Sequence, residues 1–590
     1  MPALTVQQAY ALAVQHRRAG RLREAENIYR QIVTHHPNHV DTQRNLAAIL
    51  IDTGRPDEAI GLYRRIVAIA PQDAEAFANL GRALAGRGAI PEAIDCCRRA
   101  VELRPRAAEA HYCLAGVLRT AGRVDEAIAA YRQAIALRQN YAVALYELAD
   151  VLRQKGSLDE ALATARQSLA LACDSAEAHN ILAIILREQR KLDESIAACR
   201  RAIQLKADAA DAYVNLGLAT QEQGKLSEAE AMYRRAIELQ PNLVDAHNNL
   251  GIVLWEQGRA DEAAEAYRAA LAAKPMDAKA RFNLGLLQLA IGDFASGWEN
   301  HEARFEANPQ LIISKFPQPL WDGSDPAGKR ILVQCEQGFG DTFQFIRYAP
   351  LLADRGARVI VRCPPELRRL LSGQRGIEQV ISTGDAIPEF DAHVPLLSLP
   401  RLFGTTIGTI PAHVPYLKAD PEQVAQWRVR LAKEPGQMKV GLVWAGRPRQ
   451  RVDQNRSVPP QILAPLADAS ELTWVSLQKD RTELLPDEFH VIDWTSELAD
   501  FADTAALISA LDLVMSIDTG VAHLSGALGK PTWVLLMHIP DWRWMLGGSE
   551  SAWYPTMRLF RQPVAGDWET PVRQMAELLL AWHHVRHISR

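Results

Sequence analysis

The chain has 590 residues, of which 48% are hydrophobic and 23% charged, and its formal net charge is −4 with a pI near 6.5. This length is too great for one core, so we expect a soluble protein of several domains. The balanced charge provides no global field for nucleic acid or an anionic membrane, and we expect neither as a partner.

Residues 1–20 contain no long apolar core, and no run of 18 apolar residues occurs in the sequence, so we expect neither export nor a membrane span. The seven cysteines form no CxxC pair and follow no regular spacing, which disfavours a disulfide framework and a zinc site. We therefore expect a cytoplasmic protein with reduced thiols and no bound metal.

A repeat of 34 residues runs through the first half of the chain, and each unit predicts two helices joined by a turn. The turn glycine recurs in one register, with Arg190 in the single gap: Gly20, Gly54, Gly88, Gly122, Gly156, Gly224, Gly258 and Gly292. The pattern resembles tetratricopeptide repeats, with about eight complete units over residues 6–277 and a divergent ninth. We expect an all-α superhelix over residues 1–311, because each helix pair must stack on its neighbours to bury its apolar face.

An asparagine recurs at one place on the expected inner wall of the array, and the series is interrupted by Cys113, Glu147 and Ile181. The amide can donate to and accept from the backbone of an extended peptide, which predicts an acceptor-binding groove. A similar ladder occurs in the repeats of eukaryotic O-GlcNAc transferase, which this half resembles. The alternative is that the amides tie adjacent helices together. The residues concerned are Asn45, Asn79, Asn215, Asn249 and Asn283.

After residue 311 the composition changes to Pro, Gly and Asp, and we expect a linker over residues 312–328. Residues 329–436 then predict a first α/β half. The buried-strand pattern KRILVQC runs into EQGFGD, in which Gly338 and Gly340 permit a tight turn and the close approach of a ligand. Phe343 occupies the third glycine position of a dinucleotide fingerprint, so this loop is not one.

Residues 437–590 predict a second α/β half, beginning with the strand KVGLVWAG. A basic loop with Arg447, Arg449, Arg451 and Arg456 follows, and then the strand LTWVSLQKD, which carries Gln478 and Lys479 near its end. Residues 511–537 predict strand, turn, helix and strand, with the turn at Asp518-Thr519-Gly520. The first N–H groups of such a helix can hold a phosphate, although Asp518 or Thr519 can also serve simply as a helix cap.

The second half of the chain resembles the heptosyltransferase-like glycosyltransferases of GT-B fold, in which two Rossmann-like halves face a cleft. The matching motifs are Gly340-Asp341 and Asp518-Thr519-Gly520-Val521-Ala522-His523. The order EQGFGD, VGLVWAG, NRS, SLQK, DTGVAHLSGALGKPTWVL and DWRW resembles bacterial tetratricopeptide-containing glycosyltransferases, including enzymes that modify flagellin.

The resemblance implies a role for each matching residue. Asp341 would be the base that deprotonates the acceptor, although it can also cap its helix. The turn at Thr519 and Gly520 would receive the donor phosphate, with added charge from Arg456. His523 would hydrogen-bond the donor or pack in the core. Gln478 would contact ribose or base, and Lys479 would reach phosphate or solvent. No DxD triplet occurs, so we expect inverting transfer without a metal or a cofactor other than the nucleotide sugar.

The leading hypothesis is therefore a nucleotide-sugar-dependent protein O-glycosyltransferase whose repeats bind the acceptor protein. The likeness to flagellin modifiers implies flagellin Ser or Thr as the acceptor and a CMP-linked nonulosonic acid as the donor. Two alternatives are a repeat scaffold with an inactive transferase domain and a heptosyltransferase-like enzyme of lipopolysaccharide synthesis. The sequence leaves the oligomeric state open, and fold alone does not fix a substrate.

Overall fold

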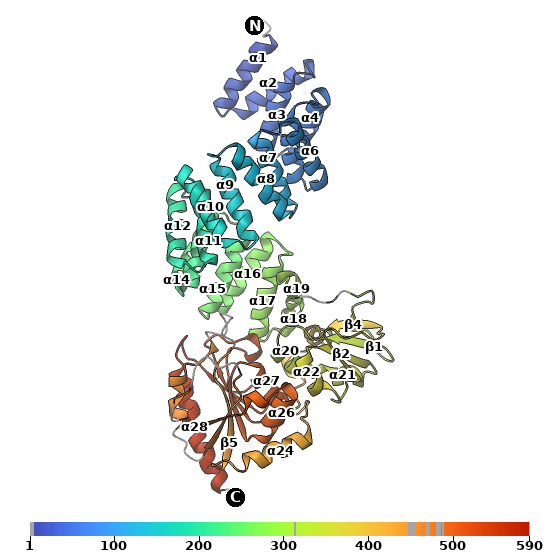
Figure 1. The fold of residues 1–590 in the computed structure, drawn as a ribbon, viewed down its shortest axis with the longest axis vertical. Coiled ribbons are helices and arrows are strands. Elements are labelled where there is room, and N and C mark those ends of the chain that lie inside the picture. The colour runs from blue at the N-terminus through green and yellow to red at the C-terminus, as the bar shows by residue number, and fades with distance from the viewer. Residues whose placement is uncertain are drawn as a thin grey trace. The chain divides into compact units, whose positions relative to one another are not determined.

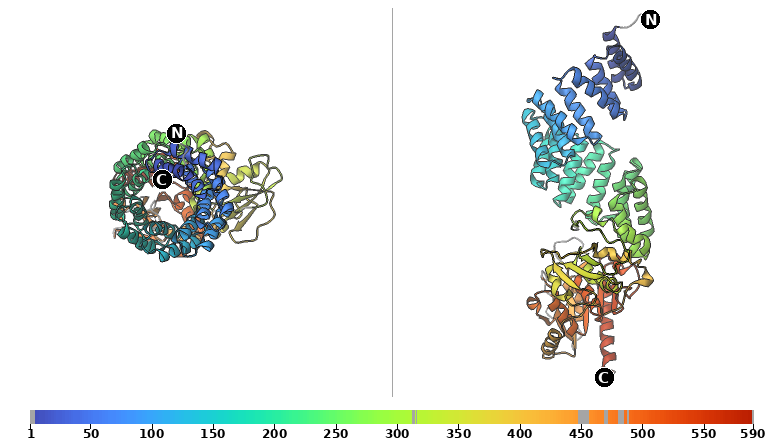
Figure 2. Two further views of the ribbon diagram at one scale, coloured as in Figure 1. Left: turned by 90° about the horizontal axis from the view of Figure 1, so that it is seen from above. Right: turned by 90° about the vertical axis from the view of Figure 1, so that its right-hand side faces the viewer.

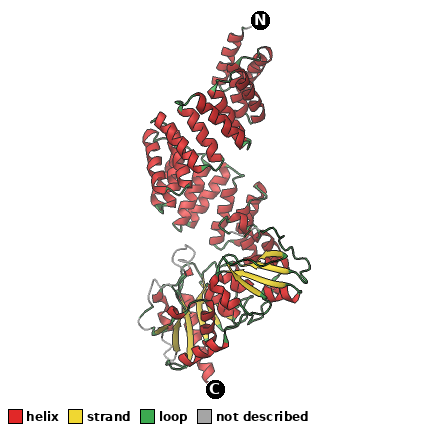
Figure 3. Ribbon diagram, turned by 45° about the vertical axis from the view of Figure 1, so that its right-hand side comes forward, coloured by secondary structure: helices red, strands yellow, loops and turns green. Residues whose placement is uncertain are grey.

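The computed structural model describes residues 5–311, 314, 316–446, 456–467, 472–479, 485–486 and 489–588, with side chains as far as residue 581. The chain divides into two compact units, Met1–Pro241 and Asn242–Arg590. The strands drawn in Figure 3 all belong to the second unit. Within the described ranges, no helix combines the length and the apolar character that a bilayer crossing requires.

The first unit is a series of antiparallel helix pairs, which follow one another around a ring when seen from above (Figure 2). Alanine, leucine and tyrosine from successive pairs form one continuous buried cluster, so each pair is stabilised by its neighbours. The helices are α1 (Val6–Arg18), α2 (Leu22–His35), α3 (Val40–Asp52), α4 (Pro56–Ile69), α5 (Ala74–Gly86), α6 (Ile90–Leu103), α7 (Ala108–Thr120), α8 (Val124–Leu137), α9 (Ala142–Gln154), α10 (Leu158–Leu171), α11 (Ala176–Glu188), α12 (Leu192–Leu205), α13 (Ala210–Glu222) and α14 (Leu226–Leu239).

The backbone conformation explains why glycine recurs at the turn of each repeat. At each of its positions the backbone is left-handed, as at Gly54 with φ of 76° and Gly156 with φ of 86°. Glycine adopts this conformation without steric cost, whereas other residues pay about 1–2 kcal/mol. Arg190 takes the same conformation with φ of 64°. The repeat geometry is therefore kept across the one gap in the glycine series.

The second unit begins with helices of the repeat pattern, and one buried cluster runs from these helices into the sheet region, while the expected domain boundary at residue 311 stays a prediction. Leu289, Phe294 and Trp298 lie in the same buried cluster as residues of the parallel sheets. The indole N–H of Trp298 also donates to the carbonyl of Thr405 at 3.1 Å. The compact division therefore falls at Pro241 and Asn242. The helices are α15 (Val244–Glu256), α16 (Ala260–Ala273), α17 (Ala278–Ile291), α18 (Phe294–His301) and α19 (Arg304–Ala307).

Part of the expected linker, residues 312–328, pairs with the first sheet. The backbone N–H of Trp321 donates to the carbonyl of His393 at 2.8 Å, and Leu320 forms a parallel bridge with His393. The Trp321 side chain is buried in the main cluster of the second unit. Residues 319–321 therefore pair with the edge of the first sheet.

The first sheet has four parallel strands in the order β3-β2-β1-β4. Figure 1 labels three of them, β1, β2 and β4. Two helices, α20 and α21, rather than one continuous helix follow the first strand. Pro350 explains the break, because its ring cannot follow a continuous helix through Ile346 four residues earlier. The elements are β1 (Arg330–Gln334), α20 (Phe339–Phe345), α21 (Tyr348–Asp354), β2 (Arg358–Cys363), α22 (Pro365–Leu371), β3 (Gln379–Ser382), β4 (Ala392–Pro395), η1 (Leu396–Ser398), α23 (Leu399–Leu402) and η2 (Ile407–Thr409).

The second sheet has six parallel strands in the order β10-β9-β8-β5-β6-β7. Counted from β5, this is one of the common strand orders of doubly wound parallel sheets. The elements are α24 (Pro421–Leu431), β5 (Met438–Val443), η3 (Pro460–Leu466), β6 (Leu472–Ser476), β7 (Val491–Asp493), η4 (Thr495–Glu497), α26 (Phe501–Ala510), β8 (Leu513–Ile517), α27 (Gly520–Ala527), β9 (Thr532–Leu536), η5 (Trp542–Trp544), β10 (Met557–Arg561) and α28 (Glu569–Ile588).

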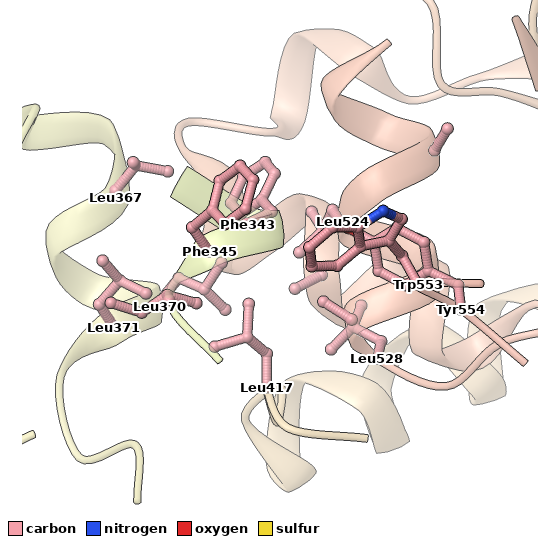
Figure 4. Packing of buried hydrophobic residues seen from close by; sticks show 14 of the residues in the cluster. Phe343, Phe345, Leu367, Leu370, Leu371, Leu417, Leu524, Leu528, Trp553 and Tyr554 are labelled. Atoms are coloured by element: carbon pink, nitrogen blue, oxygen red, sulfur yellow. The ribbon is translucent and has the colours of Figure 1, made fainter. Parts of the chain in front are cut away.

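An apolar contact joins the two sheet regions (Figure 4). Phe343 and Phe345 of α20 lie on one side, and Leu524 of α27 with Trp553 and Tyr554 lies on the other, all within one buried cluster. Burial of apolar surface is the main favourable term in such a contact. It holds the end of β1 against the start of α27, where the candidate site is found.

Candidate functional site

Two loops from different sheets meet at the carboxyl ends of β1 and β8. In the first sheet the chain adds β2 and β3 on one side of β1 and then β4 on the other, so the strand order reverses beside β1. In the second sheet the strand order reverses between β5 and β8. Such switch points are where open parallel sheets bind ligands. The loop after β1 leads to Asp341, and the loop after β8 contains Asp518 and Thr519.

The approach of these loops is close enough to require glycine at position 340. A Cβ atom on Gly340 would lie 2.9 Å from Cδ2 of His523, and one on Gly520 would lie 3.6 Å from the backbone nitrogen of Gly340. Real Cβ contacts almost never fall below 3.0 Å. The sequence motifs of the two halves, GD and DTGxxH, are thus brought together.

Asp341 lies in the first turn of α20, and both of its oxygens have partners. Oδ2 accepts from the backbone N–H of Gly338 at 2.8 Å, which is the cap interaction considered from the sequence. Oδ1 accepts from Nη2 of Arg543. The two side chains are only 15% and 10% exposed. Asp341 therefore acts as a helix cap and also forms an ion pair with a residue of the second half.

Arg543 is a site residue that we did not predict. It lies in η5, and its Nη1 donates to Oδ1 of Asp541 at 2.7 Å. Burial acts to lower the pKa of Arg543, but the charges of Asp541 and Asp341 outweigh it and the pKa is raised, so the guanidinium stays charged. The available signal was the DWRW motif, but the sequence alone could not give its partner, because Asp341 is 202 residues away.

Asp518 and His523 form a second polar pair, with 3.7 Å between Oδ1 and Nε2. Burial acts to raise the pKa of Asp518, but the hydrogen bond and charge of His523 and the charge of Arg456 lower it below its ordinary value. The other ring nitrogen of His523 lies 3.0 Å from the hydroxyl of Tyr554. The ring also stacks on Trp544 with 5.0 Å between centroids. His523 therefore belongs both to the core and to the polar site.

The start of α27 has the features of an anion site. Thr519 is the N-cap residue, and among the described side chains none caps the helix. The hydroxyl of Thr519 instead lies 3.0 Å from the hydroxyl of Ser516. The N–H groups of the first turn, beginning at Gly520, are therefore not satisfied by a side-chain cap, and the helix dipole favours negative charge there.

Gln478 and Lys479 are engaged within the second half. Oε1 of Gln478 accepts from the backbone N–H groups of Trp444 and Ala445 at 3.2 and 2.9 Å, which ties together the ends of β5 and β6. Nζ of Lys479 donates to the carbonyl of Leu498 at 2.6 Å. Their expected contacts with the donor stay predictions. Of the basic loop, Arg447, Arg449 and Arg451 lie outside the described residues.

Three of the five ladder asparagines hydrogen-bond to a neighbouring repeat. Asn45 accepts from Arg17 at 2.6 Å and donates to the hydroxyl of Tyr10 at 2.8 Å. The remaining pairs are Asn215 with Asn180, at 2.8 Å, and Asn283 with Asn248, at 2.9 Å. These contacts favour the interpretation in which the amides tie adjacent helices together. Peptide binding by Asn79 and Asn249, which are half-buried, stays a prediction.

A cavity of about 700 Å³ lies at a different place in the second unit. Arg347, Leu370, Tyr416 and Ala502 contribute to its wall, and the predicted site residues do not. The guanidinium of Arg347 donates to three backbone carbonyls and to the hydroxyl of Tyr416, so it has a structural role in the wall. We place the candidate site at the two loops, because the reactive side chains converge there.

The first part of the protein is a tetratricopeptide-repeat superhelix, and a region with parallel sheets follows it. Residues 3–218 match the family described as "Cilia and flagella-associated protein 70 C-terminal domain". Residues 214–275 and 248–297 match "Tetratricopeptide repeat". Tetratricopeptide arrays typically offer a binding surface to peptides or proteins.

Among curated proteins, the chain is 28% identical to "Protein FlbA" of Caulobacter vibrioides over 321 residues, which are 49% of this chain and 53% of that protein. The chain thus spans about half the length of the curated relative that it matches.

Among solved structures, the APC/C hetero-tetramer Cut9-Hcn1 is similar with 19% identity and a TM-score of 0.38, over 45% of this chain and 52% of that chain. YrrB, described as a TPR protein with an unusual peptide-binding site, is similar with 22% identity and a TM-score of 0.26, over 31% and 95%. MamA is similar with 29% identity and a TM-score of 0.25, over 28% and 97%.

Proposed function

We propose that this protein is a nucleotide-sugar-dependent protein O-glycosyltransferase of GT-B type, whose repeats bind the acceptor protein. The observation that carries the proposal is the meeting of the Gly340-Asp341 loop with the start of α27, where Gly520 and His523 lie against Gly340. A carboxylate and an anion-binding helix end from two different sheets are the parts that sugar transfer from a nucleotide requires.

In the proposed reaction, Asp341 accepts the proton of an acceptor Ser or Thr hydroxyl as its oxygen attacks the anomeric carbon of the sugar. The bond from that carbon to the nucleotide phosphate breaks, and the sugar is transferred with inversion. The negative charge that develops on the leaving phosphate is stabilised by the first N–H groups of α27 and by Arg456. General-base catalysis of this kind contributes roughly 10² to 10⁴ in rate.

Flagellin is the acceptor that we propose, and a CMP-linked nonulosonic acid is the proposed donor, both from the family resemblance of the sequence motifs. Arginine suits such a donor, because a guanidinium binds a sugar carboxylate as well as a phosphate. No metal or further cofactor takes part in the proposed reaction.

The experiment is mass spectrometry of flagellar filaments from cells with and without this protein. The proposal expects a sugar on flagellin Ser or Thr that disappears in the deletion strain and returns with the wild-type gene but not with Asp341→Asn. Restoration by Asp341→Asn at the wild-type level would instead support the repeat scaffold with an inactive transferase domain.

A further inference from the structure

We infer that Arg543 is a positioning residue for Asp341 that holds the carboxylate in the geometry needed for proton abstraction. The inference rests on the proposed function, in which Asp341 is the base. The two residues come from different sheet regions, so their contact makes the geometry of the base depend on the second half of the transferase.

The guanidinium of Arg543 is itself held in place from several sides. Oδ1 of Asp541 accepts from its Nη1 at 2.7 Å and from its backbone N–H at 3.0 Å. The ring of Trp542 lies 4.5 Å from Cζ, and the ring of Phe345 lies 5.9 Å away. Because these contacts fix the guanidinium plane, its Nη2 presents a donor to Asp341 in one direction.

The carboxylate of Asp341 is consequently held through both oxygens, by Arg543 on Oδ1 and by Gly338 on Oδ2. Each carboxylate oxygen has more than one lone-pair site, so Asp341 can still accept the proton of a hydroxyl. A reacting group gains rate when its orientation is set before the substrate arrives, and small misplacements are costly. Arg543 provides this orientation.

A second role for Arg543 would be to leave Asp341 and bind the anionic group of the donor. The contacts favour positioning over such an exchange. Arg543 is only 10% exposed, and departure would break its contacts with Asp341, Asp541 and Trp542 together.

The test measures kcat and the donor KM of the full chain with flagellin and a CMP-linked nonulosonic acid, by release of CMP. The variants are Arg543→Met, Arg543→Lys, Asp341→Asn and the double variant Asp341→Asn/Arg543→Met. Arg558→Met is the control, because Arg558 is an exposed arginine of β10. Asp541→Asn is a further variant that loosens the Arg543 anchor and keeps the arginine, in case Arg543→Met unfolds.

We expect Arg543→Met to lower kcat by about tenfold to a hundredfold, which is no more than the lower end of the roughly 10² to 10⁴ that a general base supplies, with donor KM changed less than about twofold. Arg543→Lys should recover part of the loss, and Asp541→Asn should show a smaller fall in kcat alone. The double variant should be no slower than Asp341→Asn, because Arg543 acts through that carboxylate.

A rise in donor KM with unchanged kcat would overturn the inference and assign Arg543 to donor binding. If the double variant had a kcat below that of Asp341→Asn by the full factor lost in Arg543→Met, the inference would be overturned in favour of a purely structural role for Arg543. The release of CMP by the wild type is measured first. If the wild type releases no CMP with this donor, the proposed donor is overturned, and so is the role inferred for Arg543. Wild-type turnover combined with either of the two preceding results would overturn only the role of Arg543.

Discussion

Arg304 of α19 donates from Nη2 to Oε1 of Glu336 at 2.8 Å, and the two side chains are only 0% and 8% exposed. The same oxygen accepts from the backbone N–H of Leu397 at 3.1 Å. Burial raises the pKa of Glu336, and the charge of Arg304 opposes that shift. The pair fastens the end of the repeat helices to the loop after β1, five residues before Asp341.

Replacing Arg304 by Met should therefore destabilise the second unit strongly. Removal of one partner of a buried pair leaves an uncompensated charge and typically costs about 3–5 kcal/mol. Urea unfolding monitored by tryptophan fluorescence measures the change. Arg358→Met is the matched control, because its pair with Glu378 is exposed and such pairs contribute roughly 0–1 kcal/mol. Equal losses in the two variants would contradict the structural role of the Arg304 pair.

Fragments of the chain should respect the division at Pro241. We expect residues 242–590 to fold by themselves and residues 329–590 to be insoluble or molten, because the shorter fragment lacks Phe294 and Trp298 of the shared core. Circular dichroism and cooperative thermal unfolding of the two purified fragments measure this. If residues 329–590 unfold cooperatively at the same temperature as the longer fragment, the result would support a domain boundary near residue 311.

Gly340→Ala should disturb the candidate site. The added methyl group would lie 2.9 Å from the ring of His523, and overpacking of this kind costs about 1–3 kcal/mol. We expect lower stability and, in a thermal-shift assay with nucleotides, weaker stabilisation by the ligand. Gly408→Ala is the control, since a methyl group there meets no atom within 4 Å. The close approach of the two loops would be refuted by a Gly340→Ala protein indistinguishable from the control.

The contribution of Asp518 to stability should depend on pH. The pKa of Asp518 is lowered from its ordinary value of 3.8, so the folded state favours the ionised form. Its contribution to stability is therefore fully present at a pH above the pKa of the unfolded state and is lost as the pH falls through the pKa of the folded state. The stability difference between wild type and Asp518→Asn should shrink as the pH falls below about 4. A difference that grows in acid would show that the assigned direction is wrong.

The regular parts of the fold could be predicted because local chemistry determines them. The glycine register marks left-handed turns, and the expected strand KRILVQC contains β1. The superhelix and the parallel sheets are confirmed by the structure. The compact division at Pro241 could not be predicted, because the repeat pattern continues through α17 while Leu289 already packs against the sheets.

The candidate site was predictable only in part. Asp341, Asp518 and Gly520 belong to local motifs that stand directly after strands, where ligands bind. The partner of Asp341 depends on how the two sheets pack, so Arg543 could not be paired with it in advance. The spacing of the ladder asparagines could be recognised in the sequence. Whether their amides face a ligand or a neighbouring helix could not, because it depends on side-chain contacts such as that of Asn45 with Arg17.

The measurement that most directly tests the account is the intact mass of purified flagellin after incubation with this protein and a panel of nucleotide sugars. The account predicts that a CMP-linked nonulosonic acid raises the mass by one or more sugar residues with the wild type, and that Asp341→Asn reduces the rate by roughly 10² or more. Flagellin of unchanged mass with every donor, or equal modification by Asp341→Asn, would contradict the claim that the meeting of the two loops forms a transferase site.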